Sequence, residues 1–313
     1  AVTAALADTE ISHTNTFDVT LTADSTATAA ELIAINAATT KSVTATGVTA
    51  ITGSISDINS ILAVETSQVN AGQQIDLDTN FTVTVTDTGS VAATTLTTLD
   101  SGVPGTLIAN NVATVTGTAA EIAAAATADE NGTLQLKSDF SAPVGAGTAS
   151  ESDLNTIKSI TSGTNTVNET TTITGTTSQL TSLYEASGFS GLGDEAITIT
   201  NQTEATATAI NLVNGFTSGI VDATNITTIT GSTENINAVY ASFDNNEISN
   251  LGNENVTIND TSLSSSLLKT LNTKTTGTIN ASTVQTFTGS ISCLLYTSPS
   301  PRDQRGSGMP GCA

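Results

Sequence analysis

The sequence predicts a repeat protein, an α/β solenoid of parallel strands and short helices with about 30 residues per rung. Three observations predict this fold class. A Thr-Ile-Thr-Gly motif recurs along the chain, a sister motif with Asp or Asn in place of the glycine lies between its copies, and a helix-start pattern follows most copies. An all-β β-helix, in which the Ala-rich pieces are only turns, is the alternative.

The composition excludes one large globular core built on aromatic side chains. Of 313 residues only 3% are aromatic and none is tryptophan, whereas Thr, Ala, Ser, Asn and Gly dominate. Two classes of chain have such a composition: a disordered Ser/Thr-rich stalk, and a repeat protein that buries small β-branched residues in stacked layers. The regular recurrence of the motifs favours the repeat protein.

The strands are predicted from the alternation of β-branched apolar and polar residues, which buries one face of a strand and hydrates the other. The central apolar residues of the two motifs follow one another at a mean step near 30 residues, which predicts about ten rungs: Leu21, Ile51, Val85, Val115, Leu136, Ile173, Ile199, Ile229, Ile258 and Phe287. One buried column, with one residue per rung, is expected from Leu21, Ile51, Val115, Ile173, Ile199, Ile229, Ile258 and Phe287.

A helix is predicted after each strand, because capping-box spacing follows the motif glycine. The pairs are Thr118/Glu121, Ser54/Asp57, Thr176/Gln179 and Ser232/Asn235. Apolar residues then recur at three- and four-residue intervals, as expected for a helix with one buried face. Examples are Leu180, Leu183 and Tyr184; Ile236, Val239 and Tyr240; and Leu263, Leu267, Leu268 and Leu271.

The last residues, Cys293–Ala313, have a composition that the rest of the chain avoids. They hold both cysteines, both arginines and the only methionine. Back-translated, they resemble a sequencing adapter read in frame, so residues 293–313 are interpreted as a non-native, adapter-derived tail without structure of its own. Residues 1–292 are predicted to form a single repeat array. Because the chain begins with Ala1, both ends are interpreted as cuts in a longer protein, a metagenomic fragment.

The charge restricts the partners. The formal net charge is −22 with only 7 Lys and Arg, whereas nucleic acid and anionic lipid both bind clustered basic residues. No apolar run approaches the roughly 18 residues of a membrane span. We therefore expect no nucleic acid partner and no membrane insertion of this fragment. The expected partners are neighbouring repeats of the same longer chain, and surface polysaccharide is a further candidate.

Catalytic chemistry has few candidate residues. His13 is the sole histidine, so we expect neither a Ser-His-Asp triad nor a zinc site with several histidine ligands in this fragment. Asp194 and Glu195 form the clearest acid pair, but the sister copy reads Asn253 where Asp194 stands, which favours a turn. No catalytic residue and no organic cofactor is predicted, and the protein is expected not to be an enzyme.

Calcium is the candidate ligand. Asp76, Asp78 and Asn80 place oxygen atoms at alternate positions, and residues 129–132 form a short acidic turn. Calcium takes six to eight oxygens, and neither stretch supplies the glycine and distal Glu of a full calcium loop. The candidate metal ligands are thus Asp76, Asp78 and Asn80, and diffuse cation binding by the acidic chain is the alternative.

Residues 227–290 resemble the tandem repeats of very large cell-surface and secreted proteins of marine cyanobacteria. The phrases that carry the resemblance are NLGNENVTIND, SLLKTLNTKTTGTINAS and TITGS, and the match is good over about 170–292. The resemblance implies an extracellular surface-layer, adhesive or motility-associated protein. It brings no catalytic residues with it.

Together these observations predict a structural or adhesive segment of a giant secreted or cell-surface repeat protein, acidic and threonine-rich. One alternative is a carbohydrate- or calcium-binding module of such a protein, since rows of Thr suit a polysaccharide- or ice-binding face. Thr is, however, also a residue that favours strands and tolerates water. A further alternative is a β-helical polysaccharide-active enzyme, which would need acidic or basic groups clustered at a groove.

Overall fold

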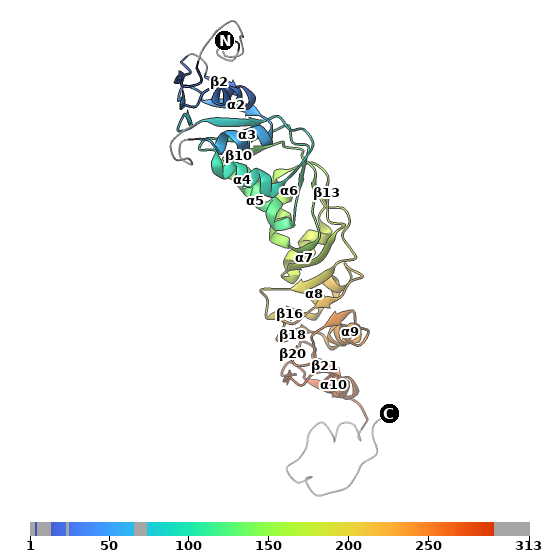
Figure 1. Ribbon diagram of the computed structural model, residues 1–313. Helices are drawn as coiled ribbons and strands as arrows, with labels where there is room; N and C mark the ends of the chain where they lie inside the picture. Colours follow the sequence, from blue (N-terminus) through green and yellow to red (C-terminus); the bar gives the residue numbers. More distant parts are fainter. Residues whose placement is uncertain (1–3, 5–13, 23–24, 66–73, 291–313) are drawn as a thin grey trace. The chain divides into compact units, whose positions relative to one another are not determined.

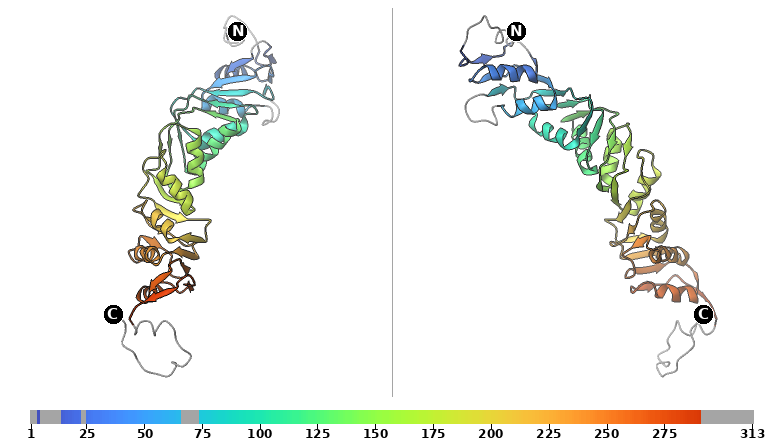
Figure 2. Two further views of the ribbon diagram at one scale, coloured as in Figure 1. Left: turned by 180° about the vertical axis from the view of Figure 1, so that it is seen from behind. Right: turned by 45° about the vertical axis from the view of Figure 1, so that its right-hand side comes forward.

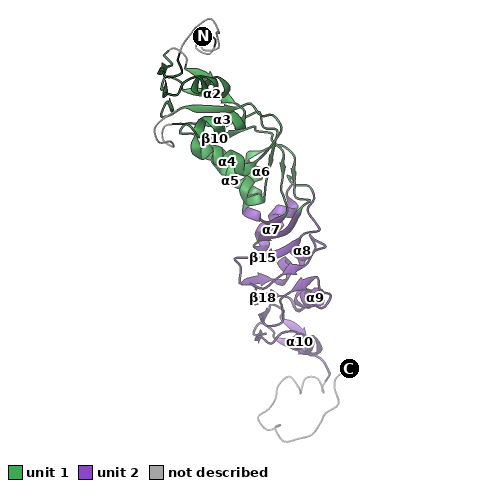
Figure 3. Cartoon of the chain, viewed as in Figure 1, with its two compact units in different colours: residues 1–146, 153–169, 188–190 green, residues 147–152, 170–187, 191–313 purple. Residues whose placement is uncertain are grey.

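The computed structural model describes residue 4 and residues 14–22, 25–65 and 74–290 (Figure 1). The chain divides into two compact units, coloured separately in Figure 3. Unit 1 consists of Ala1–Ala146, Asp153–Glu169 and Gly188–Ser190, and unit 2 consists of Gly147–Ser152, Thr170–Ser187 and Gly191–Ala313.

Short strands and helices alternate in both units. The elements of unit 1 are β1 (Val19–Thr20), β2 (Thr26–Thr28), α2 (Ala29–Ala38), β3 (Val43–Ala45), β4 (Ala50–Gly53), α3 (Ile55–Leu62), β5 (Ile75–Leu77), β6 (Thr82–Val85), β7 (Ser90–Ala92), α4 (Ala93–Gly102), β8 (Leu107–Ala109), β9 (Thr114–Thr116), α5 (Ala119–Asn131), β10 (Leu134–Leu136), β11 (Ala142–Pro143) and β13 (Asn165–Thr166). Helix α6 (Glu151–Ile160) has residues in both units.

The elements of unit 2 repeat the same pattern. They are β12 (Gly147–Ser150), β14 (Thr170–Gly175), α7 (Thr177–Glu185), β15 (Ala196–Ile199), β16 (Glu204–Thr206), α8 (Ala207–Asn214), β17 (Val221–Asp222), β18 (Thr228–Gly231), α9 (Thr233–Asp244), β19 (Ile248–Ser249), β20 (Asn255–Ile258), β21 (Ser262–Ser264), α10 (Ser265–Asn272), β22 (Ile279–Asn280) and β23 (Thr286–Thr288).

Two kinds of module occur along the chain, where a module is one helix together with the strands that lead into it. They alternate from α3 to α7 and again from α9 to α10; in the module of α8, whose named strands are β15 and β16, an isolated bridge from Ser190 to Thr166 takes the place of a first strand. In a two-strand module the helix follows the second strand, as in β8–β9–α5 and β17–β18–α9. In a three-strand module a further strand precedes the helix, as in β5–β6–β7–α4 and β19–β20–β21–α10. One module follows another about every 30 residues, which confirms the predicted alternation and its period.

Parallel strand pairing joins successive modules throughout the described residues. We call a row of paired strands a ladder: the longest has the order β10-β8-β6-β4-β2 in unit 1 and β12-β14-β15-β17-β19 in unit 2. A three-strand module ends one ladder and begins another. In the described part of unit 2, β19 pairs with β17 alone, β20 pairs with β18 and β22, and β21 starts a ladder with β23.

The core of each unit consists of aliphatic side chains between ladders and helices. Ile229 and Val256 are ladder partners and are both fully buried, as are Ile51 and Val83 in unit 1. The helices pack in a row beside the ladders, α4 against α5 and α8 against α9 (Figure 2). Burying each such aliphatic side chain stabilises the fold by about 1.5–3 kcal/mol. The core of a single module is small, so the stability of the unit depends on the sum over repeated modules.

The glycine of the Thr-Ile-Thr-Gly motif allows a close approach between modules. A Cβ on Gly53 would lie 2.8 Å from the Cβ of Ala29, the first residue of the preceding helix. Gly231 has a φ of 153° and a Cβ there would lie 3.3 Å from the Cβ of Ala207. The motif therefore needs glycine because its last residue faces the start of the neighbouring helix.

The helix starts agree with the sequence prediction. Full capping boxes form at Thr118/Glu121 and Thr176/Gln179, and the side chains of Ser54 and Ser232 accept the predicted backbone N–H groups. Helices α2 to α10 in the described residues show that the all-β alternative is wrong. Leu263, predicted in a helix, lies in β21 instead, because the helix begins only at Ser265.

The prediction of a single buried column is wrong. Ile173 pairs with Ile197, whereas Ile199, two residues further on, pairs with Gly175. Phe287 pairs with Leu263 and is 43% exposed, and Leu21 is only half-buried. The error has one cause: the third strand of each three-strand module was not recognised, so the two motifs were aligned as equivalents although they occupy different places in the ladders.

Candidate functional site

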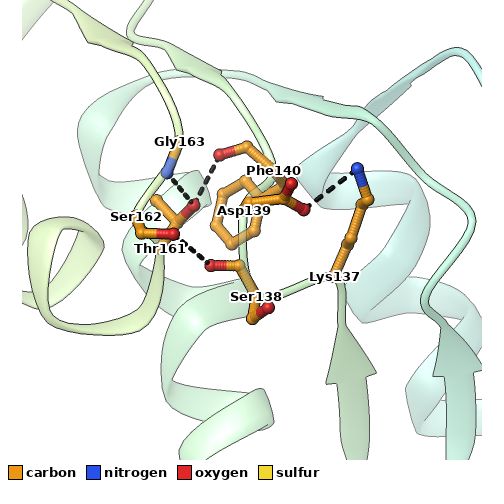
Figure 4. A network of polar contacts seen from close by, with 7 residues as sticks. All are labelled: Lys137, Ser138, Asp139, Phe140, Thr161, Ser162 and Gly163. Carbon is orange, nitrogen blue, oxygen red and sulfur yellow. Dashed lines mark hydrogen bonds and ion pairs between the residues drawn. The ribbon is translucent and has the colours of Figure 1, made fainter.

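A threonine hydroxyl fastens the turn that leads into a two-strand module. Thr161 donates to the carbonyl of Phe140 at 2.5 Å and accepts the backbone N–H of Gly163 at 3.0 Å (Figure 4). Beside it, the backbone N–H and the hydroxyl of Ser162 donate to the carbonyl of Ser138 at 3.0 and 3.3 Å. Four hydrogen bonds thus hold these three consecutive residues. In two of the four bonds, a side-chain hydroxyl donates to a backbone carbonyl of the preceding loop.

The same arrangement recurs twice in unit 2. The hydroxyl-to-carbonyl distances are 2.5 and 2.6 Å, and the N–H-to-hydroxyl distance is 2.9 Å in both copies. We call this arrangement the junction. Its residues are Thr161, Ser162, Gly163 and Phe140 in unit 1, and Thr217, Ser218, Gly219 and Glu195, then Thr275, Thr276, Gly277 and Glu254, in unit 2.

No side chain fits at the junction glycine. A Cβ would lie between 2.1 and 2.3 Å from the carbonyl oxygen of the junction's own Phe or Glu, at Gly163, Gly219 and Gly277 alike. Near the start of the described chain, Thr39 bridges the carbonyl of Phe17 and the N–H of Lys41 in the same way. The backbone geometry is therefore common to both units.

A buried carboxylate occupies the junction in unit 2. Glu254 is 1% exposed, and its Oε1 accepts the phenol O–H of Tyr240, which is fully buried in α9. Its Oε2 accepts the backbone N–H groups of Gly252 and Asn253 at 2.7 and 3.1 Å. Gly252 has a φ of 115°, a conformation that turns two consecutive N–H groups toward one anion.

The other junction of unit 2 is built in the same way. Glu195 is 3% exposed, accepts the phenol of Tyr184 from α7, and accepts the N–H groups of Gly193 and Asp194 at 2.9 and 3.2 Å. Tyr184 also stacks on Phe216, with ring centroids 5.1 Å apart. Each buried carboxylate therefore has three donors, the condition under which burying a charge is tolerable.

Two groups of unit 2 have shifted pKa values. Burial raises the pKa of Tyr240 well above its ordinary value, and the hydrogen bond to Glu254 and the charge of that carboxylate raise it further. For Asp222 burial acts to raise the pKa, but hydrogen bonds from the Thr224 hydroxyl, Asn250 and the Thr224 backbone together bring it below the ordinary value. Both groups keep one protonation state across the neutral range.

In unit 1 the junction has no carboxylate. Phe140 stands where Glu254 stands in unit 2, and it is fully buried. Ala126 of α5 and Tyr240 of α9 both lie eight residues after the helix N-cap, and both are fully buried. At these two positions unit 1 therefore has a phenyl ring and a methyl group where unit 2 has a carboxylate and a phenol.

A second contact joins modules at the helix starts. In three helices the first N–H, which has no intrahelical acceptor, donates to a side-chain oxygen of the next module, and the helix dipole favours this contact. These bonds are Ile55 N to Asp87 (2.9 Å), Thr177 N to Gln202 (2.8 Å) and Thr233 N to Asp260 (2.6 Å).

The predicted metal ligands lie at the end of β5. Asp76 is in the strand, in register with Thr44, and Asp78 Oδ1 accepts the backbone N–H of Asn80 at 2.8 Å, which closes a turn. In the described residues no group of three or more His, Cys, Asp and Glu side chains is placed to hold a metal ion. The calcium site therefore stays a prediction.

The other singled-out residues have structural partners. Of the acid pair, Glu195 is the buried junction carboxylate and Asp194 is exposed. In the turn at 129–132, Asp129 accepts the backbone N–H of Leu136 at 2.6 Å, and Gly132 ends α5 with a φ of 78°. His13 and residues 293–313 lie outside the described residues.

A hollow of about 320 Å³ lies in unit 1 beside Gly117 and Gly145. Glu169 is the ionisable side chain among its lining residues, and Asn168 lies next to it. The lining brings together neither a nucleophile with a base nor two carboxylates, the minimum for the common hydrolytic mechanisms.

Sequence reasoning missed the junction almost completely. The phenols of Tyr184 and Tyr240 were assigned to the apolar faces of their helices, and the Thr-Ser/Thr-Gly turns at 161, 217 and 275 were passed over. These turns recur with the same spacing as the Thr-Ile-Thr-Gly motif, so aligning the chain with the longer period would have found them.

Comparisons with known proteins give no relative. No family model, no curated protein and no solved structure matches this chain. Among the described residues, none of the helices is both long and apolar enough to cross a bilayer. The interpretation of the site therefore depends on its geometry alone. The recurrent polar groups of this chain form hydrogen bonds between one module and the next.

Proposed function

We propose that this chain is a structural or adhesive segment of a giant extracellular surface repeat protein, without enzymatic activity, whose modules stack as an α/β solenoid. The observation that carries the proposal is the junction. Its Thr, Gly and Glu or Phe recur in register with the helices, and their polar atoms bind neighbouring backbone rather than an opening where a substrate would enter. Contacts of this kind stabilise one module against the next, as stacking requires.

The composition of the surface supports an extracellular or cell-surface location. With a net charge of −22 the chain repels nucleic acid and anionic lipid, and seawater-like salt would screen its self-repulsion. The proposed partners are therefore further modules of the same longer chain, with surface polysaccharide as the candidate adhesive target. Neither nucleic acid nor membrane insertion is part of the proposal.

The stacking is tested by a local defect. Ile229→Asp puts an unpaired charge among fully buried aliphatic residues, which costs several kcal/mol, about 3 or more. In a solenoid each module contacts only its neighbours, so hydrogen exchange should speed up in β16 to β20 and stay unchanged around β4 and β6. Ala238→Asp, at an exposed position of α9, is the control. Uniform acceleration across the chain would contradict the solenoid.

Carbohydrate binding is the second candidate function, and one ladder favours it. Thr206, Thr230, Thr257 and Asn280 are successive ladder partners that all carry a hydroxyl or amide group. Strand spacing places such groups about 4.8 Å apart in a regular row, which is an arrangement that can donate to and accept from the hydroxyl groups of an extended sugar chain. Glycan-array binding that is lost in Thr230→Val/Thr257→Val would support an adhesive face, and turnover of an acidic polysaccharide would instead indicate an enzyme.

A further inference from the structure

Two sheets of the described chain have the same length, and a third row of strands reaches it through isolated bridges. The third row is β7-β9 followed by β11-β13, joined by the bridge from Thr114 to Ser141 and extended by the bridge from Thr166 to Ser190, whereas β1-β3-β5 has three strands. The sheets β10-β8-β6-β4-β2 and β12-β14-β15-β17-β19 each have five strands. Each begins with a strand that directly precedes a helix, β2 before α2 and β12 before α6. Each ends with the first strand of a three-strand module, β10 and β19. Five strands is therefore the length that the alternation of two- and three-strand modules produces.

The last two ladders of the described chain are shorter. The sheet β16-β18-β20-β22 has four strands, and β21-β23 has two. By the rule of the longer ladders, β22 needs one further parallel strand and β23 needs three. The described chain thus ends on two parallel edges with unpaired backbone groups, which are templates for strand addition.

The side chains at this end show the same incompleteness. Phe287 occupies the place of Ile229 and Ile173 in the Thr-X-Thr-Gly strand, yet it is 43% exposed, whereas both isoleucines are fully buried. All three residues of β23 are exposed. An aromatic side chain that stands in a core position, and that the described residues leave 43% exposed, indicates an interface that continues beyond β23.

We propose that the edge formed by β22 and β23 is the acceptor surface for a three-strand module of this chain's own type. The inference rests on the proposed function and names the partner that the stacking requires. Ser290 stands where the N-cap Ser232 stands, so the helix that completes the module of β22 and β23 comes between Ser290 and the strands of the three-strand module. Its first strand pairs with β22 as β19 pairs with β17, and its second covers Phe287 as Val256 covers Ile229.

The chemistry of the occupant follows from the ladder. Its second strand carries a β-branched or aliphatic residue opposite Phe287 and another opposite Gly289, as Val256 and Ile258 lie opposite Ile229 and Gly231. Two or three residues later it carries Asp or Gln to accept the first N–H of the preceding helix, as Asp260 and Gln202 do. This pattern distinguishes a module from any other apolar partner.

The test is a tandem duplication. A copy of residues 233–290 is inserted between Ser290 and Ile291 of the full chain, so that the copied β19 and β20 follow Ser290 in the same phase as in the original. We expect the amides of 279–280 and 286–288 to exchange at least 10-fold more slowly than in the unchanged chain. A duplicated chain without this protection overturns the proposal, because the same residues form β19 to β21 in their original place.

Two controls separate the possible occupants. Phe287→Asp should lower the melting temperature of the unchanged chain by only about 1–2 °C, because Phe287 is 43% exposed there, and should abolish the protection in the duplicated chain. Sedimentation and hydrogen exchange of the unchanged chain at several concentrations test a second copy as the occupant. A dimer whose amides 279–288 become protected as the concentration rises would overturn the proposal in favour of self-association. Both results differ from the failure of the solenoid itself, which the Ile229→Asp experiment reports in the chain without duplication.

Discussion

The junctions of units 1 and 2 share a backbone and differ in what they bury. Thr161 and Thr275 make the same pair of hydrogen bonds, but one binds the carbonyl of Phe140 and the other that of Glu254. The residue eight positions after the helix N-cap differs in the same sense, Ala126 in unit 1 and Tyr240 in unit 2. An apolar filling and a polar one therefore fit one scaffold.

The difference teaches that the residues buried at each junction, which we call its filling, depend on one another. A carboxylate at this depth needs the phenol and two N–H groups, and the N–H groups need the positive φ of Gly252. In unit 1 the corresponding loop holds Ser138 and Asp139, with Lys137 paired to Asp139 at the surface, and turns no N–H toward Phe140. A single substitution cannot convert one set into the other without stranding a buried polar group.

The largest expected effect falls on what the two junctions share. Gly163→Ala in unit 1 and Gly277→Ala in unit 2 each place a Cβ within 2.2 Å of a backbone carbonyl oxygen. We expect both to destabilise by several kcal/mol, about 3–5, with loss of protection confined to the affected unit. Gly89→Ala, where a Cβ meets nothing within 4 Å, is the control and should be nearly neutral. Urea unfolding measures all three, and a tolerant Gly277 would show that the shared backbone is not the fastening element.

The next effect distinguishes the two fillings. Glu254→Ala removes the acceptor of three donors and leaves a cavity beside Tyr240, so unit 2 should lose about 3 kcal/mol. The double variant Tyr240→Ala/Glu254→Phe copies the residues of unit 1 and should recover at least half of that loss. If the double variant is as unstable as Glu254→Ala alone, then the fillings are not interchangeable and the comparison fails.

The converse substitution is more damaging in unit 1. Phe140→Glu buries a carboxylate without the phenol and without a glycine of positive φ in the loop, and should cost about 3–5 kcal/mol. Phe140→Leu is the control and should cost about 1–2 kcal/mol for the smaller side chain. Equal costs for Glu and Leu would mean that solvent reaches the junction.

A smaller effect appears at alkaline pH, in unit 2 alone. The pKa of Tyr240 is raised in the folded state, so its contribution is complete below the unfolded pKa of about 10 and is lost as the pH rises further. We expect unit 2 to lose about 1.4 kcal/mol for each pH unit above 10. Tyr240→Phe should lack this slope. Absorbance at 295 nm during urea unfolding follows the phenol, and ionisation of Tyr240 in the folded protein near pH 10 would contradict the prediction.

The smallest effect concerns ions. The chain carries 29 Asp and Glu against 7 Lys and Arg, so screening should stabilise both units, by sodium nearly as well as by calcium at equal ionic strength. Thermal melts in sodium chloride and in low millimolar calcium at fixed ionic strength measure the difference. A stabilisation of unit 1 by calcium alone, lost in Asp76→Asn/Asp78→Asn, would instead establish the predicted metal site.

The sequence predicts the alternation of strand and helix because local signals specify it. Capping residues such as Thr118 and Thr176 and the period-two strands act within a few residues, and each was recognised. The ladders were predicted less well, because pairing depends on residues 23 to 32 positions away and β16 or β21 is too short to stand out beside a helix. Local pattern specifies elements, whereas register is a non-local property.

The junction was beyond local reasoning for a different reason. Tyr240 has the spacing of a core residue, and nothing in α9 itself indicates that its phenol meets a carboxylate 14 residues later. Glu254 likewise reads as part of a polar turn. Only the joint recurrence of Tyr, Gly-X-Glu and Thr-Ser/Thr-Gly with one common period connects the three, and that signal needs the right period first.

The stagger of the ladders has a mechanical consequence. In unit 2 the boundary between the modules of α8 and α9 is crossed by both β15–β17 and β16–β18, and the next boundary by β17–β19 and β18–β20. Where one ladder ends, a neighbouring ladder continues through the same module. Because the backbone hydrogen bonds of a ladder run from one module to the next, tension along the stack pulls on them lengthwise, and at each of these two boundaries of unit 2 the load is divided between two rows of bonds.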